Sequence, residues 1–174
     1  MCDKIGDIRD CFHEQGKVIK EILEVGTGID KPKMGYLCRI KFLAYYFDKE
    51  IFDTSPDDGA GTIDLYLGDV KYIEGLWRGI CEMRLGERAK IKIKKTFAFG
   101  RPGEVEKLIF PKKCNREKLT SKGVIYQVEL VSMVARQDID ASGNVFKQTL
   151  TKPKKGEYEL PGDNDELQFK LAFY

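Results

Sequence analysis

The sequence lacks most of the residue patterns on which metal centres, membrane anchors and nucleophilic active sites are built. It has a single histidine, and none of its five cysteines forms a CxxC pair. No apolar run approaches the roughly 20 residues that a membrane-spanning helix needs. The N-terminal stretch shows no secretory signal pattern, and a net charge of +2 argues against nucleic acid or a membrane as a partner. We therefore expect no metal and no cofactor, and a reduced, cytoplasmic setting.

The most informative stretch is 67–93, where the apolar period changes from that of a helix to that of a strand. At roughly 100° per residue, the apolar side chains of 72–83 gather on one side of a helix. Gly75 and Gly79 share one seam of this helix. Because a helical glycine costs about 1 kcal/mol relative to alanine, we expect the two glycines to permit close packing.

Short alternating runs predict strands on both sides of this helix. The expected strands lie within 16–24, 38–47, 51–55, 63–67, 88–93 and 124–133. The helical spacing of Ile5, Ile8 and Phe12 predicts a short helix in 1–15, and 100–123 reads as a long charged loop. This order predicts an α+β fold, a twisted antiparallel β-sheet curled around one short α-helix.

Residues 16–133 carry several pieces that, in this order and spacing, resemble the FKBP-type peptidyl-prolyl cis-trans isomerases. The matching pieces are VGTG at 25–28, FDTS at 52–55, LG at 67–68, IEGLWRGI at 73–80, MRLGERAKI at 83–91, FAFG at 97–100 and VIYQVEL at 124–130. The resemblance covers essentially the whole family domain and implies its fold. It also implies an apolar pocket that lowers the barrier to rotation about X-Pro bonds without a nucleophile or a metal.

Carried over residue by residue, the resemblance implies a set of site residues around one pocket. The implied catalytic residues are Phe42, Phe52, Asp53, Ile73, Leu76, Phe99 and Tyr126, and the implied binding residues are Ile63, Tyr72, Leu108, Ile109 and Phe110. The apolar run 108–110 fits a pocket rim, and it fits a lid on the core equally well.

Several of these residues depart from the family pattern. Leu76 stands where active members usually have a tryptophan, and Phe42 and Phe99 replace tyrosines whose hydroxyls form hydrogen bonds. Tyr72 is larger and Ile63 smaller than the usual residues, and the loop 56–61 lacks its arginine. Since each lost hydrogen bond is worth around 1 kcal/mol, we expect an isomerase of low activity. The alternative is a non-catalytic FKBP-like module for protein–protein interaction.

The chain is expected to contain more than this one domain. We assign 1–15 to an N-terminal extension, 16–133 to the FKBP-like domain and 134–142 to a linker. The segment 143–174 echoes residues 16–23 and 43–46, which predicts a partial second FKBP-like repeat. The partners that the resemblance implies are proline-containing segments of client proteins, rapamycin-type macrolides at weakened affinity and, by analogy alone, a chaperone.

Overall fold

The computed structural model describes residues 3–11, 16–56, 61–100, 103, 105–111, 114–138 and 146–148. Its elements in chain order are β1 (Ile8–Asp10), β2 (Val18–Glu24), β3 (Leu37–Tyr46), β4 (Ile51–Thr54), β5 (Ile63–Tyr66), α1 (Glu74–Cys81), β6 (Arg88–Ile93), η1 (Lys95–Phe97), η2 (Val105–Lys107), α2 (Arg116–Ser121), β7 (Val124–Val134), β8 (Arg136–Asp138) and β9 (Phe146–Gln148).

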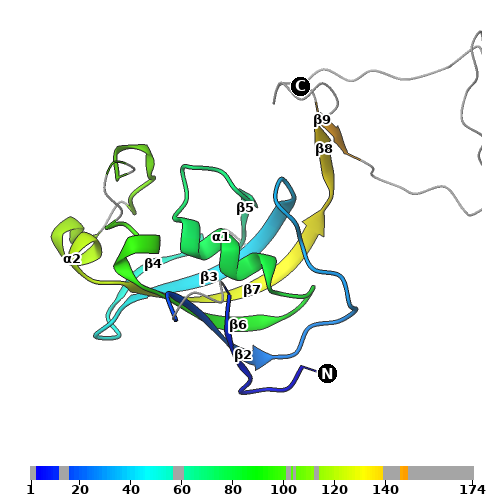
Figure 1. Ribbon diagram of the computed structural model, residues 1–174, viewed down its shortest axis with the longest axis horizontal. Coiled ribbons are helices and arrows are strands. Elements are labelled where there is room, and N and C mark those ends of the chain that lie inside the picture. Colours follow the sequence, from blue (N-terminus) through cyan, green and yellow to red (C-terminus); the bar gives the residue numbers. More distant parts are fainter. Residues whose placement is uncertain are drawn as a thin grey trace, which may run out of the picture.

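Strands β1 to β7 form one seven-stranded sheet in the order β1-β2-β6-β7-β3-β4, and β5 also pairs with β3. Every pairing is antiparallel. The sheet curves around α1, which lies across its inner face (Figure 1). This is the α+β architecture that the sequence predicts.

Helix α1 packs closely on β6 because two of its buried positions are glycines. A Cβ atom on Gly75 would lie 2.3 Å from Cγ2 of Ile93, and one on Gly79 would lie 2.7 Å from Cδ1 of Ile91. The predicted packing role of the two glycines is confirmed. The helix is shorter than predicted, since Ile73 is its N-cap and it ends at Cys81.

Strand β2 buries a charged side chain among its apolar ones. Val18, Lys20 and Ile22 all face the core and are fully buried. The Lys20 Nζ lies 2.6 Å from Oε1 of Glu87, whose own side chain is 1% exposed. Oε2 of Glu87 accepts a hydrogen bond from the backbone N–H of Arg84, so this pair fixes the turn that leads into β6.

The prediction of a helix in 1–15 is wrong, because residues 8–10 form β1, which pairs with β2 at the edge of the sheet. The side chains of Ile5 and Ile8 are 72% and 69% exposed, so their spacing reports no buried face. So short a helix is marginal unless it packs on something, whereas an edge strand gains backbone hydrogen bonds from its neighbour. Asp3 forms ion pairs with Arg9 of β1 and with Arg84, and so connects this edge strand to the turn before β6.

The prediction of a long charged loop over 100–123 is wrong in part. It contains η2 and α2, which begins where the side chain of Asn115 accepts a hydrogen bond from the backbone N–H of Lys118 at 3.0 Å. This N-cap satisfies a backbone donor that the first turn of a helix leaves free.

Beyond Val134, β8 pairs with β9 as a separate two-stranded sheet. The predicted linker 134–142 therefore includes the end of β7 and all of β8, and its residues 139–142 lie outside the described residues. The predicted second repeat, 143–174, also lies outside them apart from β9. No described helix is long and apolar enough to cross a membrane.

Candidate functional site

An apolar hollow of about 740 Å³ lies between α1, the β3–β4 edge of the sheet and the segment that follows η2. Eight of the twelve predicted site residues line it: Phe42, Phe52, Asp53, Ile63, Tyr72, Leu76, Ile109 and Phe110. The structure thus brings together side chains that are up to 68 positions apart, from Phe42 to Phe110, on one surface. Burial of so many aromatic and aliphatic groups around one space is typical of a small-ligand or peptide site.

The floor of this hollow comes from α1 and β4. Leu76 is 3% exposed. Trp77 is the next residue along α1, about 100° further round the helix, and it lines a smaller adjoining hollow of about 200 Å³ instead. Tyr72, which precedes α1, lies between the two hollows and lines both. Burial raises the pKa of its phenol, and the charge of Asp69 adds to this effect.

The other four predicted residues lie behind or beside the hollow and do not line it. The ring of Tyr126 packs against those of Phe42 and Phe52, with centroids 5.7 Å and 6.1 Å apart. The ring of Phe99 lies 5.0 Å from that of Phe110, which covers it. Ile73 and Leu108 face the adjoining hollow. These residues support the wall and present little of their own surface.

Among the described residues that line the hollow, Asp53 alone is charged. It follows Phe52 at the irregular pairing of β3 with β4, where Ala44 faces Asp53 and Tyr45 faces Ile51. Burial raises the pKa of its carboxyl group, although a hydrogen bond from the backbone N–H of Thr54 opposes the shift. Among the described residues, that bond is its only hydrogen bond. With phenylalanine at position 42, no hydroxyl braces the carboxylate from β3.

The rim of the hollow is formed by the segment after η2. Ile109 is 56% exposed, and its backbone N–H donates to the carbonyl of Lys71 at 2.8 Å, which ties the rim to the start of α1. The guanidinium of Arg116 lies 4.6 Å from the centroid of the Phe110 ring and covers its outer side. The run 108–110 therefore lies both at the rim of the hollow and over the core, since Phe110 lines the hollow and also covers Phe99.

Sequence reasoning missed four lining residues, namely Ile51, Thr54, Pro56 and Pro111. Each is a direct neighbour in sequence, or nearly so, of a residue that it did find. No cluster of three or more metal-binding side chains occurs in the part of the chain that the structure describes. The chemistry that the described lining offers is apolar contact, one carboxylate, the hydroxyls of Thr54 and Tyr72, and backbone hydrogen bonding.

The chain resembles known proteins over this same region. A family model described as FKBP-type peptidyl-prolyl cis-trans isomerase matches residues 28–131. The FK506-binding protein 1A of Aspergillus fumigatus is 31% identical over 86 residues, which are 49% of this chain and 76% of that protein. The FK506-binding protein 59 of Drosophila melanogaster is 31% identical over 88 residues, which are 51% of this chain but 20% of that protein.

Solved structures show the same architecture. The structure of the three FKBP domains of wheat FKBP73 aligns with a TM-score of 0.55 and 27% identity, over 70% of this chain and 48% of that one. The N-terminal domain of FKBP42 from Arabidopsis thaliana aligns with a TM-score of 0.56 and 23% identity, over 76% of this chain and 94% of that one, which bears on the fold alone. The chain thus spans most of the small fungal relative, and half or less of the larger ones.

Proposed function

The chain belongs to the family of FKBP-type peptidyl-prolyl cis-trans isomerases, and from this premise we propose that its apolar hollow binds proline-containing segments of client proteins and isomerises them slowly. The observation that carries the proposal is the hollow itself, whose described lining is apolar apart from a few polar groups and the one carboxylate of Asp53. Rotation about a peptide bond passes through a twisted state that has lost amide resonance, and its barrier is about 18–20 kcal/mol. Because the planar amide is the more polar state, an apolar wall that removes water raises its free energy relative to the twisted one.

The low rate follows from what the hollow lacks. Leu76 gives it an aliphatic floor, and neither Phe42 nor Phe99 carries a hydroxyl that could hold a carbonyl or the Asp53 carboxylate. If each missing hydrogen bond is worth about 1 kcal/mol, two or three of them cost on the order of one to two powers of ten in rate. The same losses weaken the binding of rapamycin-type macrolides at this site.

The second candidate is a non-catalytic module that binds a protein segment in the same hollow. The observation that favours it is the covered position of Phe99 under Phe110. A bound carbonyl would then meet aromatic carbon where a donor is needed. Such a module would hold a proline segment by its apolar surface without lowering the barrier to rotation.

We extend the proposal to the setting in which the protein works, namely protein folding in the cytoplasm beside a chaperone. The described cysteines Cys11, Cys38, Cys81 and Cys114 are free thiols, which supports a reducing compartment. The likeness to the multi-domain wheat structure supports a place within a larger folding assembly.

A protease-coupled assay on a proline tetrapeptide, beside an active family member with a tryptophan floor, tests the enzyme proposal. We expect kcat/KM about a hundredfold below that of the active member. The variant Ile109→Glu puts a charge on the rim and should remove the activity, whereas Ile29→Glu, at a site that is 85% exposed and outside the hollow, should not. Peptide binding to the hollow without any rate gain would favour the binding module. If the peptide neither binds nor isomerises faster, both proposals are overturned.

A further inference from the structure

The outer face of the sheet, opposite α1, carries a row of residues across four strands, of which three residues are apolar or aromatic and one is a lysine. The antiparallel register places Ile19 of β2 beside Lys92 of β6, Lys92 beside Ile125 of β7, and Ile125 beside Tyr45 of β3. These residues alternate with the buried core positions of each strand, so their side chains point away from α1. Outward-facing positions of a half-exposed antiparallel sheet are ordinarily polar.

Three large apolar side chains of this face form the floor of a hollow of about 510 Å³. They are Tyr45 and Phe47, at the end of β3, and Ile125 of β7. The ring of Phe47 is held over Gly123, where a Cβ atom would lie 2.4 Å from its Cε2. Phe47 nevertheless remains 44% exposed. An aromatic ring that is fixed in place and left half in water is a preformed contact for a partner's apolar side chain.

The charged groups around this hollow are all lysines: Lys49, Lys90 and Lys92. Lys90 lies 3.6 Å from Glu21 of β2, while Lys49 and Lys92 have no carboxylate within 4.0 Å in the described part of the chain. The two acidic neighbours of Lys49 are engaged elsewhere, because Asp48 and Glu50 each lie 2.6 Å from the Nζ of Lys118. Lys49 and Lys92 therefore place positive charge that has no ion-pair partner among the described residues next to an apolar floor.

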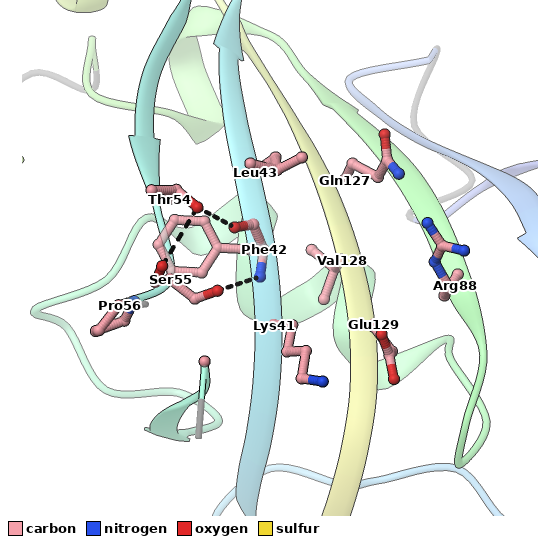
Figure 2. A pocket seen from close by; sticks show the side chains of 11 residues that line it. Lys41, Phe42, Leu43, Thr54, Ser55, Pro56, Arg88, Gln127, Val128 and Glu129 are labelled. Atoms are coloured by element: carbon pink, nitrogen blue, oxygen red, sulfur yellow. Dashed lines mark hydrogen bonds between the residues drawn. The ribbon is translucent and has the colours of Figure 1, made fainter. Parts of the chain in front are cut away.

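A neighbouring hollow of about 500 Å³ on the outer face of the sheet has a different charge pattern, so the excess of lysines is a local feature (Figure 2). There Glu129 of β7 faces Arg88 of β6 on one side and Lys41 of β3 on the other. Positive and negative side chains alternate across those strands, and Arg88 forms an ion pair with Glu24 of β2. The two hollows share Gln127, where the charge pattern changes from mixed to positive.

We propose that the lysine-rimmed hollow is a docking site for an acidic segment of a partner protein, with carboxylates flanking one or two large apolar side chains. The positive rim complements the carboxylates, and the floor of Tyr45, Phe47 and Ile125 takes the apolar groups. A lipid surface fits less well, because membranes select protruding apolar groups and this site is concave. Nucleic acid fits less well because Glu21 and Glu129 interrupt the positive charge on the same face.

The test is a fluorescence-anisotropy titration of the full chain with a labelled peptide of about ten residues that alternates glutamate and leucine. We expect saturable binding that weakens several-fold between about 50 and 200 mM salt. The double variant Lys49→Glu/Lys92→Glu should lose about tenfold or more in affinity, and Phe47→Ser should lose a similar amount. Lys33→Glu, at an exposed lysine of the 25–36 segment, is the matched control and should bind as the parent does.

Three results would overturn the proposal. One is equal affinity for the same peptide with glutamine in place of glutamate, and another is parental affinity in the Lys49→Glu/Lys92→Glu variant. The third is binding to phosphatidylserine vesicles or single-stranded DNA without binding to the peptide. Amide NMR shifts locate the site independently of stability: the peptide should shift Tyr45 and Ile125, and shifts confined to Tyr72 and Leu76 would assign it to the other hollow.

Discussion

At the scale of single residues, Leu76 and Phe99 decide what the apolar hollow can do for a proline peptide bond. Leu76 is 3% exposed and presents two methyl groups where a flat ring would contact the proline. Phe99 is 2% exposed and lies against Phe110, so it adds packing but no donor. On the proposed function, both positions keep apolar packing at or behind the hollow and lack the groups that would stabilise a twisted imide over a planar one.

Restoring these two groups should therefore raise the rate. We expect Leu76→Trp with Phe99→Tyr to increase kcat/KM by about tenfold or more, which corresponds to about 1.4 kcal/mol in the barrier. The protease-coupled assay measures it, and circular dichroism confirms that the variant is folded. Trp77→Leu, which alters the adjoining hollow, is the control and should leave the rate unchanged. A folded double variant with no gain would count against the enzyme and in favour of the binding module.

We expect Asp53 to make the stability of the domain depend on pH, and the variant Asp53→Asn to remove that dependence. Burial raises its carboxyl pKa above the ordinary value of 3.8, so the folded state holds its proton more tightly than the unfolded state. Stability from this group is therefore greatest below pH 3.8 and is lost as pH rises through the folded-state pKa. We expect Asp53→Asn to be more stable than the parent at pH 7 in urea unfolding, with the difference shrinking toward pH 4. A variant that is less stable at pH 7 would mean that the carboxylate is held by bonds stronger than that of Thr54.

The candidate site was predictable where a side chain belongs to a strand or helix face, and less so elsewhere. Phe42, Phe52 and Leu76 followed from the ordered family pieces together with alternation or helical period. The exposed Ile51 was missed because the irregular pairing of β3 with β4 brings it to the hollow, and no sequence period reports such a shift. The burial of Lys20 was also unpredictable from β2 alone, since its partner Glu87 is 67 positions away.

At the scale of the element, the packing of α1 on β6 sets the depth of the hollow. Gly75 and Gly79 let the helix approach until Ile93 and Ile91 contact its backbone. The sequence predicted this close approach because two glycines in one helix need a reason. It did not predict α2, because the cap at Asn115 is a single polar residue in an already charged segment.

We expect Gly79→Ala to destabilise the domain by about 1–3 kcal/mol, because the added methyl would lie 2.7 Å from Cδ1 and Cγ2 of Ile91. The better helix propensity of alanine, worth about 1 kcal/mol, offsets only part of this cost. Adding Ile91→Val removes the Cδ1 atom and should recover part of the loss, beyond the sum of the two single effects. Urea unfolding of the four proteins measures it. Simple additivity would show that the helix moves away from β6 instead of pressing on Ile91.

At the scale of the whole molecule, the sheet places two different surfaces back to back. The inner face holds α1 and the apolar hollow, and the outer face carries the lysine-rimmed hollow on the reverse of β3, β6 and β7. Tyr45 and Tyr46, neighbours in β3, contribute to opposite faces. A partner docked on the outer face would leave the inner one open to a proline segment.

The described seven-stranded sheet should fold without the segment beyond Ala135, and its N-terminal strand should contribute to its stability. In the described part of the chain β8 and β9 form their own small sheet, and a chain of residues 1–135 would lose the contact of Arg136 with the Tyr66 ring, at 4.7 Å. We expect that shortened chain to keep the far-ultraviolet circular dichroism of a folded β-rich domain.

A chain of residues 16–135 loses β1 and the ion pair of Asp3 with Arg84, near the buried Lys20.

We expect the 16–135 chain to fold and to melt about 5 °C lower, as a loss of about 1–2 kcal/mol implies for a domain of this size. Asp3→Asn in the 1–135 chain should produce part of that loss, because it leaves Arg84 half-buried beside a neutral group. Asp64→Asn breaks an exposed pair with Arg39 and should cost less than about 1 kcal/mol, which makes it the matched control. An unfolded 1–135 chain would contradict the proposed boundary near Met133. Equal midpoints with and without residues 1–15 would mean that β1 only lines the edge of a sheet that is already complete.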